Sequence, residues 1–387
     1  MSYYRQVGSV PRKRHTVHRG DDGRRLPEEL VGQHGFSGAS SLLYHRHSPS
    51  EVVEVAAVDS ADEQWAVDVP VVPRHLRTGQ VAAGGDVVTG RRALLGNDDV
   101  VVSWVAADTD SPLYRSAVGD ELVYVQSGAG RLESQLGVLD VAAGDYVVVP
   151  SGVVHRWVVG AGPLEVLVVV ATGHVGVPRR YLSAGGQLLE HAPFCERDLR
   201  VPGEPLLVEA DGPVDVLVRT RAGAGLHRMR HHPFDVVGWD GCVYPWALSI
   251  HDFEPIVGRI HQPPPVHQTF EGPGFVVCSF VPRLLDFHPD AVKVPYHHAN
   301  IDSDEVLFYS AGQFTSRAGS GIGVGSISFH PAGFVHGPQP GSWEASLDRT
   351  ATEEVAVMVD TFRPLRVSAT GRAVSAAGYL GSWLERG

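Results

Sequence analysis

The hydrophobic residues of this chain come in short runs separated by turn-forming residues. Between residues 51 and 113 the runs VVEVAAV, WAVDVPVV, DVVTG and VVVSWVAA alternate with Gly, Pro and Asp. Valine-rich runs of this length, bounded by turn residues, are typical of strands in a sandwich or barrel. The segment EEVAVMVDTFRPLRVS has the pattern of a last buried strand. We therefore predict an all-β protein with few short helices, one of them a docking helix in the tail SAAGYLGSWLERG.

One pattern of spaced residues occurs twice. In each copy a glutamate precedes a glycine by seven positions, and a later glycine is followed at fixed intervals by proline, glycine and histidine. Agreement at this many positions indicates an internal duplication of one β-unit. We predict an N-terminal β-sandwich over residues 1–195 and a C-terminal domain over residues 196–387. The two sets are Glu121, Gly128, Gly144, Pro150, Gly152 and His155, and Glu305, Gly312, Gly325, Pro331, Gly333 and His336.

Composition narrows the function classes. The chain has 387 residues and a net charge of −12, so a nucleic-acid surface is not expected. Its 20 histidines favour a metal site. Cys195, Cys242 and Cys278 suggest no disulfide framework, and the sequence has neither a signal peptide pattern nor a long apolar segment. We therefore expect a cytoplasmic protein without nucleic-acid or membrane partners.

Two segments near the N-terminus have simpler explanations than a binding site. The basic run Arg12–His15 is short and belongs to an acidic chain, which is typical of a solvated arm or a subunit contact. His45 and His47, followed by Glu51, have the spacing of metal ligands on a strand. However, Pro49 interrupts that strand, and no matching turn and histidine follow. We predict no metal there.

The repeated spacing resembles the two motifs of the cupin jelly roll, in which a strand pair and a Pro-x-Gly turn present metal ligands. In metal-binding cupins the first motif supplies two histidines and a glutamate, and the second motif supplies a third histidine. In the N-terminal copy the matching positions are Tyr114, Ser116, Glu121 and His155. Two of these four are not the expected ligands. We therefore predict a structural or oligomer-forming half without a full ligand set.

The C-terminal copy keeps more of the ligand set. Its positions are His298, Asn300, Glu305 and His336. Two neutral imidazoles and one carboxylate suit Fe(II) and leave about three coordination positions for a chelating substrate and dioxygen. The same ligands also suit catalytic zinc. We predict one Fe(II) per chain, bound by His298, Glu305 and His336.

Longer segments resemble the homogentisate 1,2-dioxygenase family. They are YHHANIDSDEVLFY, GSISFHPAGFVHGP, FDVVGWDG and VGQHGFSGASSLLYHRHSP, and the resemblance extends to VDTFRPL near the end. It implies a trimer-based homo-oligomer and a ferrous enzyme of tyrosine and phenylalanine catabolism, which opens homogentisate with dioxygen to maleylacetoacetate. The resemblance also implies that His298, Glu305 and His336 bind iron, that His330 lies beside the iron, and that Asn300 lies close to the substrate.

The chain departs from the well-known eukaryotic members of that family. Asp240 stands after the Gly-Trp pair, where those members carry a histidine thought to act as base. We therefore expect Asp240 or His330 to take the proton of the substrate phenol. Phe314 stands where the family has a tyrosine. The interval from the first ligand to the carboxylate is one residue longer, which leaves Asp304 as an alternative, but Glu305 alone keeps the spacing to the following glycine.

The sequence also offers further candidate substrate contacts and leaves several alternative functions. Tyr296 and Phe314 are candidate contacts to the ring of a small aromatic substrate. Arg283, Lys293 or Arg317 could pair with its carboxylate, although each alone is more typical of a solvated surface. The missing base histidine favours a related iron dioxygenase for gentisate, a hydroxyanthranilate or another hydroquinone. A non-catalytic bicupin binding protein and a zinc or manganese cupin isomerase are the remaining alternatives.

Overall fold

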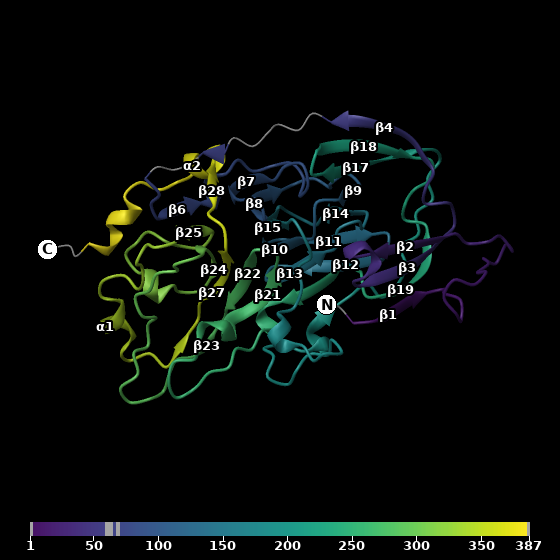
Figure 1. The fold of residues 1–387 in the computed structure, drawn as a ribbon. Coiled ribbons are helices and arrows are strands. Elements are labelled where there is room, and N and C mark those ends of the chain that lie inside the picture. The colour runs from purple at the N-terminus through teal and green to yellow at the C-terminus, as the bar shows by residue number, and fades with distance from the viewer. Residues whose placement is uncertain (1–2, 59–64, 67–69, 385–387) are drawn as a thin grey trace.

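The computed structural model describes residues 3–58, 65–66 and 70–384. Within these ranges the chain is built almost wholly from β-strands (Figure 1). The two α-helices that they contain are short, α1 (Ser342–Ser346) and α2 (Ala369–Ala373). The expected all-β fold with few short helices is confirmed. The 3-10 helices are η1 (His34–Phe36), η2 (Thr78–Gln80), η3 (Arg179–Tyr181), η4 (Glu196–Asp198), η5 (Ile250–Asp252), η6 (Pro264–His267), η7 (Thr315–Arg317) and η8 (Tyr379–Trp383).

A nine-stranded antiparallel sheet forms the centre of the molecule. Successive side chains of a strand point to opposite faces, and here both faces are buried. On β10, Val123 and Val125 pack on one side, and Leu122 and Tyr124 pack on the other. This is why the strands are continuous valine-rich runs. In spatial order they are β16 (Leu199–Arg200), β20 (Trp246–Ser249), β13 (Asp145–Val149), β10 (Glu121–Ser127), β15 (Leu164–Ala171), β8 (Val100–Ala107), β7 (Arg92–Gly96), β28 (Arg366–Ser368) and β5 (Trp65–Ala66).

A seven-stranded sheet covers one face of the central sheet and closes the N-terminal sandwich. Leu132 and Trp157 of this sheet pack with Val123 and its neighbours in one apolar cluster. Strands β9 and β17 pair in parallel, and the other pairs are antiparallel. The spatial order is β12 (Gly137–Ala142), β11 (Ala129–Ser134), β14 (His155–Val159), β9 (Tyr114–Ser116), β17 (Val214–Thr220), β18 (Gly223–Met229) and β4 (Val52–Val58).

A six-stranded sheet from the C-terminal half covers the other face. Phe308 approaches Tyr124 with a ring-centre distance of 6.1 Å, and Phe270 meets Tyr146 edge-on at 5.1 Å. These aromatic contacts join the two halves through one continuous core. The spatial order is β21 (Gln268–Gly272), β22 (Phe275–Phe280), β27 (Val355–Thr361), β24 (Asp304–Ala311), β25 (Ser326–His330) and β6 (Arg74–Arg77).

Strands cross the predicted boundary at residue 195 in both directions. Strand β6 comes from the N-terminal half but pairs with β25, and β17, β18 and β20 come from beyond the boundary but belong to the sheets of the N-terminal half. The C-terminal strand β28 also joins the central sheet. The boundary stays a prediction for the duplicated unit, because the sheets themselves do not divide there.

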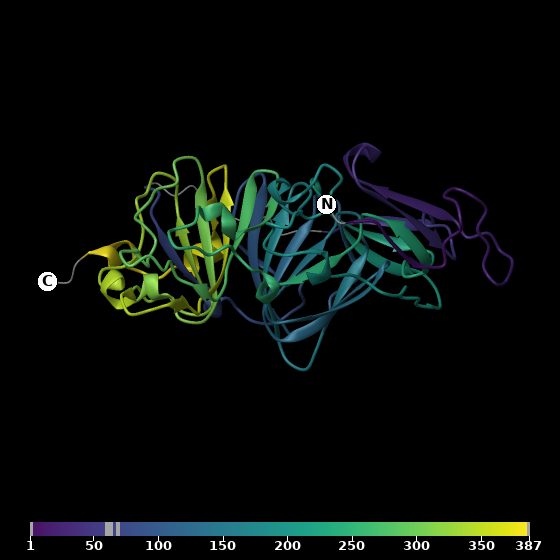
Figure 2. The ribbon, with the colours of Figure 1, turned by 90° about the horizontal axis from the view of Figure 1, so that it is seen from below.

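Besides the three large sheets, the described residues form two smaller ones. Figures 1 and 2 show the purple N-terminal strands at one end and the yellow C-terminal segments at the other. The N-terminal strands form a four-stranded sheet with β19, and a two-stranded sheet lies beside the loops of the C-terminal half. The strands are β1 (Arg5–Gly8), β19 (Val236–Gly241), β3 (Ser40–His45) and β2 (Glu28–Gly32), and β23 (Arg283–Leu284) with β26 (Ala351–Thr352).

Candidate metal centre

The outer face of β24 provides the floor of the site. Val306 and Phe308 point into the core shared with the N-terminal half, so Glu305, Leu307 and Tyr309 point to the opposite side. Opposite them stand loops and the small β23–β26 sheet rather than a second large sheet. This thinner cover leaves a cavity where the N-terminal half has a packed core.

Two histidines on these loops are brought together by backbone pairing. His298 and His336 form an isolated antiparallel bridge, in which each N–H donates to the other's carbonyl at 2.9 Å. Their ring centres are 4.3 Å apart. The backbone therefore places both imidazoles above Glu305, although 38 positions separate the histidines in the sequence.

The three side chains converge on one point. The Nε2 atom of His298 is 3.6 Å from Glu305 Oε2, and Nε2 of His336 is 3.3 Å from Oε1. One ligand atom from each residue lies within 4.8 Å of the others. Glu305 and His336 are buried, whereas the His298 side chain is 33% exposed. The site therefore opens on the side of His298.

The hydrogen bonds of the imidazoles fit a bound cation. Nδ1 of His298 donates to the Tyr296 carbonyl at 3.1 Å, and Nδ1 of His336 donates to the Phe334 carbonyl at 3.0 Å. Each Nε2 then presents a lone pair to the Glu305 carboxylate. Nε2 of His336 is buried and has no hydrogen-bond partner among the described residues. Facing lone pairs repel unless a cation lies between them, so the residues fit a divalent ion.

The electrostatics keep the carboxylate charged. Burial by itself raises the pKa of Glu305, but its three histidine neighbours outweigh burial and hold that pKa well below the usual range. Asp360 lies opposite Glu305 on β27, and burial together with the Glu305 charge raises its pKa to about 8. The Glu305 and Asp360 carboxyl groups lie close together, and the pKa of Asp360 is raised. A bound cation at this position would stabilise both carboxylates.

The N-terminal half repeats this geometry with different chemistry. Tyr114 pairs with His155 across β9 and β14 as His298 pairs with His336, and the Tyr114 hydroxyl donates to Glu121 at 2.8 Å. Arg91 donates to both Glu121 oxygens at 3.1 and 3.0 Å. A guanidinium thus neutralises the carboxylate in place of a metal. That this half lacks a full ligand set stays a prediction.

The same comparison decides between the neighbouring carboxylates of β24. Asp304 accepts the backbone N–H of Ala332 at 2.8 Å and that of Leu365 at 2.7 Å, on the side away from the triad. In the N-terminal half Asp120 has the same role, since it accepts the N–H groups of Ser151 and Val175. Asp304 is therefore a loop anchor, and Glu305 is the carboxylate of the site.

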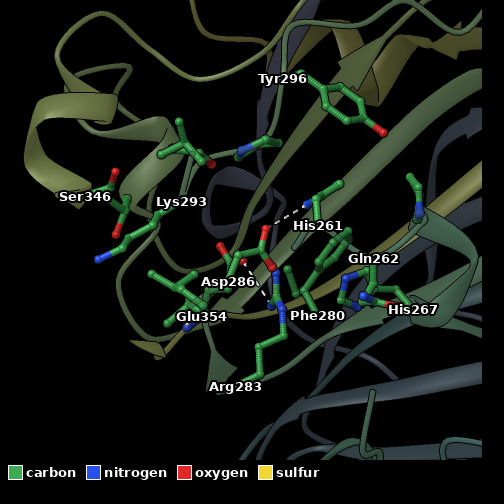
Figure 3. A pocket seen from close by; sticks show the side chains of 18 of the residues that line it. His261, Gln262, His267, Phe280, Arg283, Asp286, Lys293, Tyr296, Ser346 and Glu354 are labelled. Atoms are coloured by element: carbon green, nitrogen blue, oxygen red, sulfur yellow. Dashed lines mark hydrogen bonds and ion pairs between the residues drawn. The ribbon is translucent and has the colours of Figure 1, made fainter. Parts of the chain in front are cut away.

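A cavity of about 250 Å³ adjoins the triad (Figure 3). Its walls are mainly apolar, but they include several charged side chains. Arg283 pairs with Glu354 at 3.6 Å, and His261 pairs with Asp286 at 3.5 Å. Lys293 donates to two backbone carbonyls at 2.8 and 2.7 Å. Tyr296 also lines the cavity, and its contact with a substrate stays a prediction.

Arg317 is the most unusual of the lining residues. It is only 6% exposed, so the sequence-based view of it as a typical surface residue is wrong. Its guanidinium donates to the Tyr309 hydroxyl at 2.9 Å and to the Gly337 carbonyl at 2.8 Å. Within the described ranges it forms no ion pair with a carboxylate. A buried cation without a counter-ion is costly, so an anionic ligand would be stabilised here.

Two other expected substrate contacts do not line the cavity. Phe314 packs edge-on against Tyr309 with ring centres 4.8 Å apart, and so supports the wall from behind. The Asn300 carbonyl accepts the N–H of Gly333 at 2.7 Å and anchors the loop before His336. Both residues hold elements of the site in place.

Asp240 is not brought to the triad. It lies on β19 in the four-stranded sheet, where it accepts hydrogen bonds from Arg14 at 2.9 Å and Tyr4 at 3.0 Å. Figure 1 shows β19 and β24 in different parts of the molecule. Because the segment with the Gly-Trp pair forms a strand of the four-stranded sheet, Asp240 cannot take a substrate proton at the site of the same chain.

His330 lies beside the triad but is sealed from the cavity. Its side chain is fully buried and does not line the cavity. Nδ1 is 2.8 Å from Glu305 Oε1, and Nε2 is 3.1 Å from the Tyr379 hydroxyl. Burial lowers the pKa of His330 to about 4. With both nitrogens engaged, His330 holds Glu305 and has no access to a substrate proton.

Two residues near the triad, Asp360 and Tyr379, carry no signal in the sequence. Asp360 lies on β27, which the sequence predicts as a strand. Its position opposite Glu305 depends on the register between β27 and β24. Tyr379 lies 43 residues beyond His336 in a tail without a motif. No local pattern indicates either contact, because both arise from packing between distant segments.

Comparison with known proteins bears on this geometry. A family model described as a cupin domain matches residues 102–170. The chain is 40% identical, over 387 residues and 99% of both chains, to a Saccharolobus solfataricus protein named "Putative dioxygenase SSO1533". The chain belongs to the family of this archaeal protein. The chain thus combines a cupin domain with similarity to a protein named as a dioxygenase.

More distant relatives of this family are named for a specific reaction. The chain is 25% identical over 332 residues to homogentisate 1,2-dioxygenase of Emericella nidulans, covering 83% of this chain and 69% of that protein. A solved structure, the cupin 2 conserved barrel domain protein from Leptotrichia buccalis, aligns over 75% of this chain and 96% of its own, at 8% identity and a TM-score of 0.32. In the described part of the chain no helix is long and apolar enough to cross a membrane.

Proposed function

We propose that the protein is an Fe(II)-dependent ring-cleaving dioxygenase that converts homogentisate and dioxygen to maleylacetoacetate, in tyrosine and phenylalanine catabolism. The observation that carries the proposal is the His298, Glu305 and His336 triad beside a mostly apolar cavity, which His298 and Glu305 line. The relatives named homogentisate 1,2-dioxygenase support the choice of substrate.

The triad residues would hold the ion through two Nε2 atoms and one carboxylate. Fe(II) bound there would supply open coordination positions and the electron that lets dioxygen react with a closed-shell ring. Apolar wall residues such as Leu307 and Met358 would exclude water from the ring. Arg317 would orient the substrate carboxylate by a charge-assisted hydrogen bond.

The proton of the substrate phenol needs an acceptor that faces the cavity. His261 meets this requirement, because its imidazole lines the cavity and Asp286 lies 3.5 Å from its Nδ1. The Asp286 carboxylate would hold the proton on Nδ1 and leave Nε2 of His261 free to accept. In this proposal His261 takes the role that the sequence suggested for Asp240 or His330.

A second candidate is an iron dioxygenase for another acidic hydroquinone such as gentisate. Phe314 in the place of the family tyrosine, and the separation of Asp240 from the triad, favour it. Both candidates need the same metal, and both substrates carry a carboxylate for Arg317. The distinction lies in the distance between the carboxylate and the ring.

Oxygen uptake by anaerobically prepared, Fe(II)-loaded protein tests the proposal. Homogentisate, gentisate and 3-hydroxyanthranilate are supplied in turn, and the absorbance of the ring-opened product is followed. Oxygen uptake with homogentisate alone supports the proposed reaction. Uptake with gentisate alone supports the second candidate function. No uptake despite bound iron contradicts both and favours a binding protein.

A His261→Gln variant examines the proposed base. We expect kcat to fall by roughly 10² to 10⁴, the usual contribution of general base catalysis. The fall should be smaller above the pKa of the substrate phenol, where no base is needed. His288→Gln is the matched control, since His288 is half-buried near Asp290 and does not line the cavity. An unchanged pH profile in His261→Gln rules out this role.

A further inference from the structure

The tail of the chain reaches the metal centre. Helix η8 places Tyr379 against His330, with 3.1 Å between the hydroxyl oxygen and Nε2. His330 in turn lies 2.8 Å from Glu305. Tyr379 is 4% exposed, so this chain of contacts is shielded from solvent. A side chain that is remote in sequence thus connects to the carboxylate of the triad through one imidazole.

The direction of each hydrogen bond follows from the acceptor at its end. An ionised carboxylate only accepts, so Nδ1 of His330 carries the proton that is donated to Glu305. Nε2 of the neutral ring is then an acceptor, and the Tyr379 hydroxyl donates to it. The hydroxyl therefore fixes both the tautomer and the orientation of the imidazole. A ring without this donor would be free to present an unprotonated Nδ1 to Glu305.

The tail is docked by contacts next to a metal ligand. The Trp383 indole N–H donates to the Gly337 carbonyl at 3.0 Å, and the Gln339 amide donates to Ser382 at 3.1 Å. Gly337 directly follows the ligand His336. The rings of Tyr379 and Trp383 also meet edge-on with centres 5.1 Å apart. Helix η8 is thus held on the segment that carries the second histidine.

We propose that Tyr379 is a positioning residue of the metal centre, which acts through His330 to hold the Glu305 carboxylate in its ligating orientation. Partners of this kind behind a metal ligand typically contribute 10- to 100-fold to metal affinity. The inference rests on the metal site of the proposed function, and it does not depend on the identity of the substrate. It makes the C-terminal tail a part of the centre.

The test is the affinity of the full-length protein for Co(II), whose visible spectrum reports ligand geometry. Tyr379→Phe removes only the hydroxyl. We expect Co(II) to bind at least tenfold more weakly, with altered absorption bands, while the circular dichroism of the apoprotein is unchanged. Trp383→Phe keeps the aromatic ring but loses the bond to Gly337, and we expect a weaker effect in the same direction.

Tyr146→Phe is the matched control. Its hydroxyl is equally buried and bonds Ser279 at 2.8 Å, away from the triad. It should bind Co(II) like the wild type. Wild-type affinity and spectrum in both Tyr379→Phe and Trp383→Phe would overturn the inference and leave the proposed function intact. If the wild type binds neither Co(II) nor Fe(II), the proposed metal site itself is wrong.

Discussion

At the scale of single residues, two buried side chains define the site, His336 and Arg317. Nε2 of His336 is buried without a hydrogen bond among the described residues. The buried Arg317 donates to Tyr309 and Gly337, but within the described ranges it forms no ion pair with a carboxylate. Buried polar atoms are normally satisfied, because leaving one unpaired costs about 1–3 kcal/mol. The unpaired nitrogen of His336 therefore indicates a cation, and the buried charge of Arg317 favours an anionic ligand.

Replacement of Glu305 by Gln should abolish stoichiometric Fe(II) binding with little loss of stability. The amide keeps the shape but loses the charge that the ion needs, and the core residues of β24 are untouched. Metal analysis and thermal melting of the apoprotein check this. Glu165→Gln, on a strand outside the site, should retain the metal. Loss of folding in Glu305→Gln would show that the metal is structural.

Replacement of Arg317 by Gln should lower kcat/KM for a carboxylate-bearing substrate by roughly 10- to 100-fold, since a hydrogen bond to a charged group contributes about 1.5–3 kcal/mol. The neutral amide of the same substrate should be affected much less. Steady-state kinetics with both compounds measure the difference. Arg372→Gln is the control, because Arg372 is exposed and does not line the cavity. Equal losses for both compounds would indicate a purely structural role.

At the scale of elements, the duplicated strands show how one framework serves two purposes. Strands β10 and β24 occupy corresponding places, and each carries a buried glutamate facing a pair of bridged residues. In the C-terminal half the partners are imidazoles, and in the N-terminal half a tyrosine and Arg91 close the space. The framework is the same, and a few side chains determine whether it presents a candidate metal site or forms an internal ion pair.

Replacement of Arg91 by Ala should destabilise the protein by about 3–5 kcal/mol, because it leaves the buried Glu121 charge without its partner. Denaturant unfolding of the apoprotein measures this. Arg366→Ala breaks a pair of similar length, 2.9 Å to Asp98, but at the surface, and should cost less than about 1 kcal/mol. An equal loss of unfolding free energy in the two variants would show that burial of the Arg91–Glu121 pair does not increase its contribution to stability.

At the scale of the whole molecule, the three large sheets form a layered core, and the N-terminal strands attach to it at one end. His45 on β3 is part of this attachment, with Asp235 at 2.7 Å and Glu29 at 3.0 Å. Burial lowers the pKa of His45, but the two carboxylates outweigh burial and raise it to about 9. The folded protein therefore holds a proton that the unfolded chain releases near pH 6.5.

Stability should accordingly fall as the pH rises from about 6.5 to about 9. His45 contributes roughly 1–3 kcal/mol to the free energy of unfolding. This contribution is fully present below the pKa of His45 in the unfolded chain, and it is lost as the pH rises through the pKa of His45 in the folded protein. Denaturant unfolding at several pH values measures the slope, which His45→Gln should remove. A slope that persists in this variant would assign it to other groups.

Assembly is also a property of the whole molecule. All seven residues of β4 are exposed, and β4 is the edge of its sheet, with Val53 and Val55 more than half exposed. An apolar edge strand is a template for pairing with another chain. We predict a homo-oligomer in which β4 is buried. Val55→Lys should lower the mass of the particles in solution at equal protein concentration, as measured by mass photometry. Val71→Lys, an exposed valine outside the strand, should not.

The sequence by itself determined the fold class, the duplication and the three candidate ligands. Each of these depends on local spacing, which is preserved because strand alternation and turn geometry act over a few residues. Glu305 could be preferred over Asp304 for this reason. Only the tertiary structure decided which side chains meet across distant segments. It separated Asp240 from the triad, sealed His330 behind Glu305, buried Arg317 and brought Tyr379 to the centre, because these contacts depend on how sheets and loops pack rather than on any pattern along the chain.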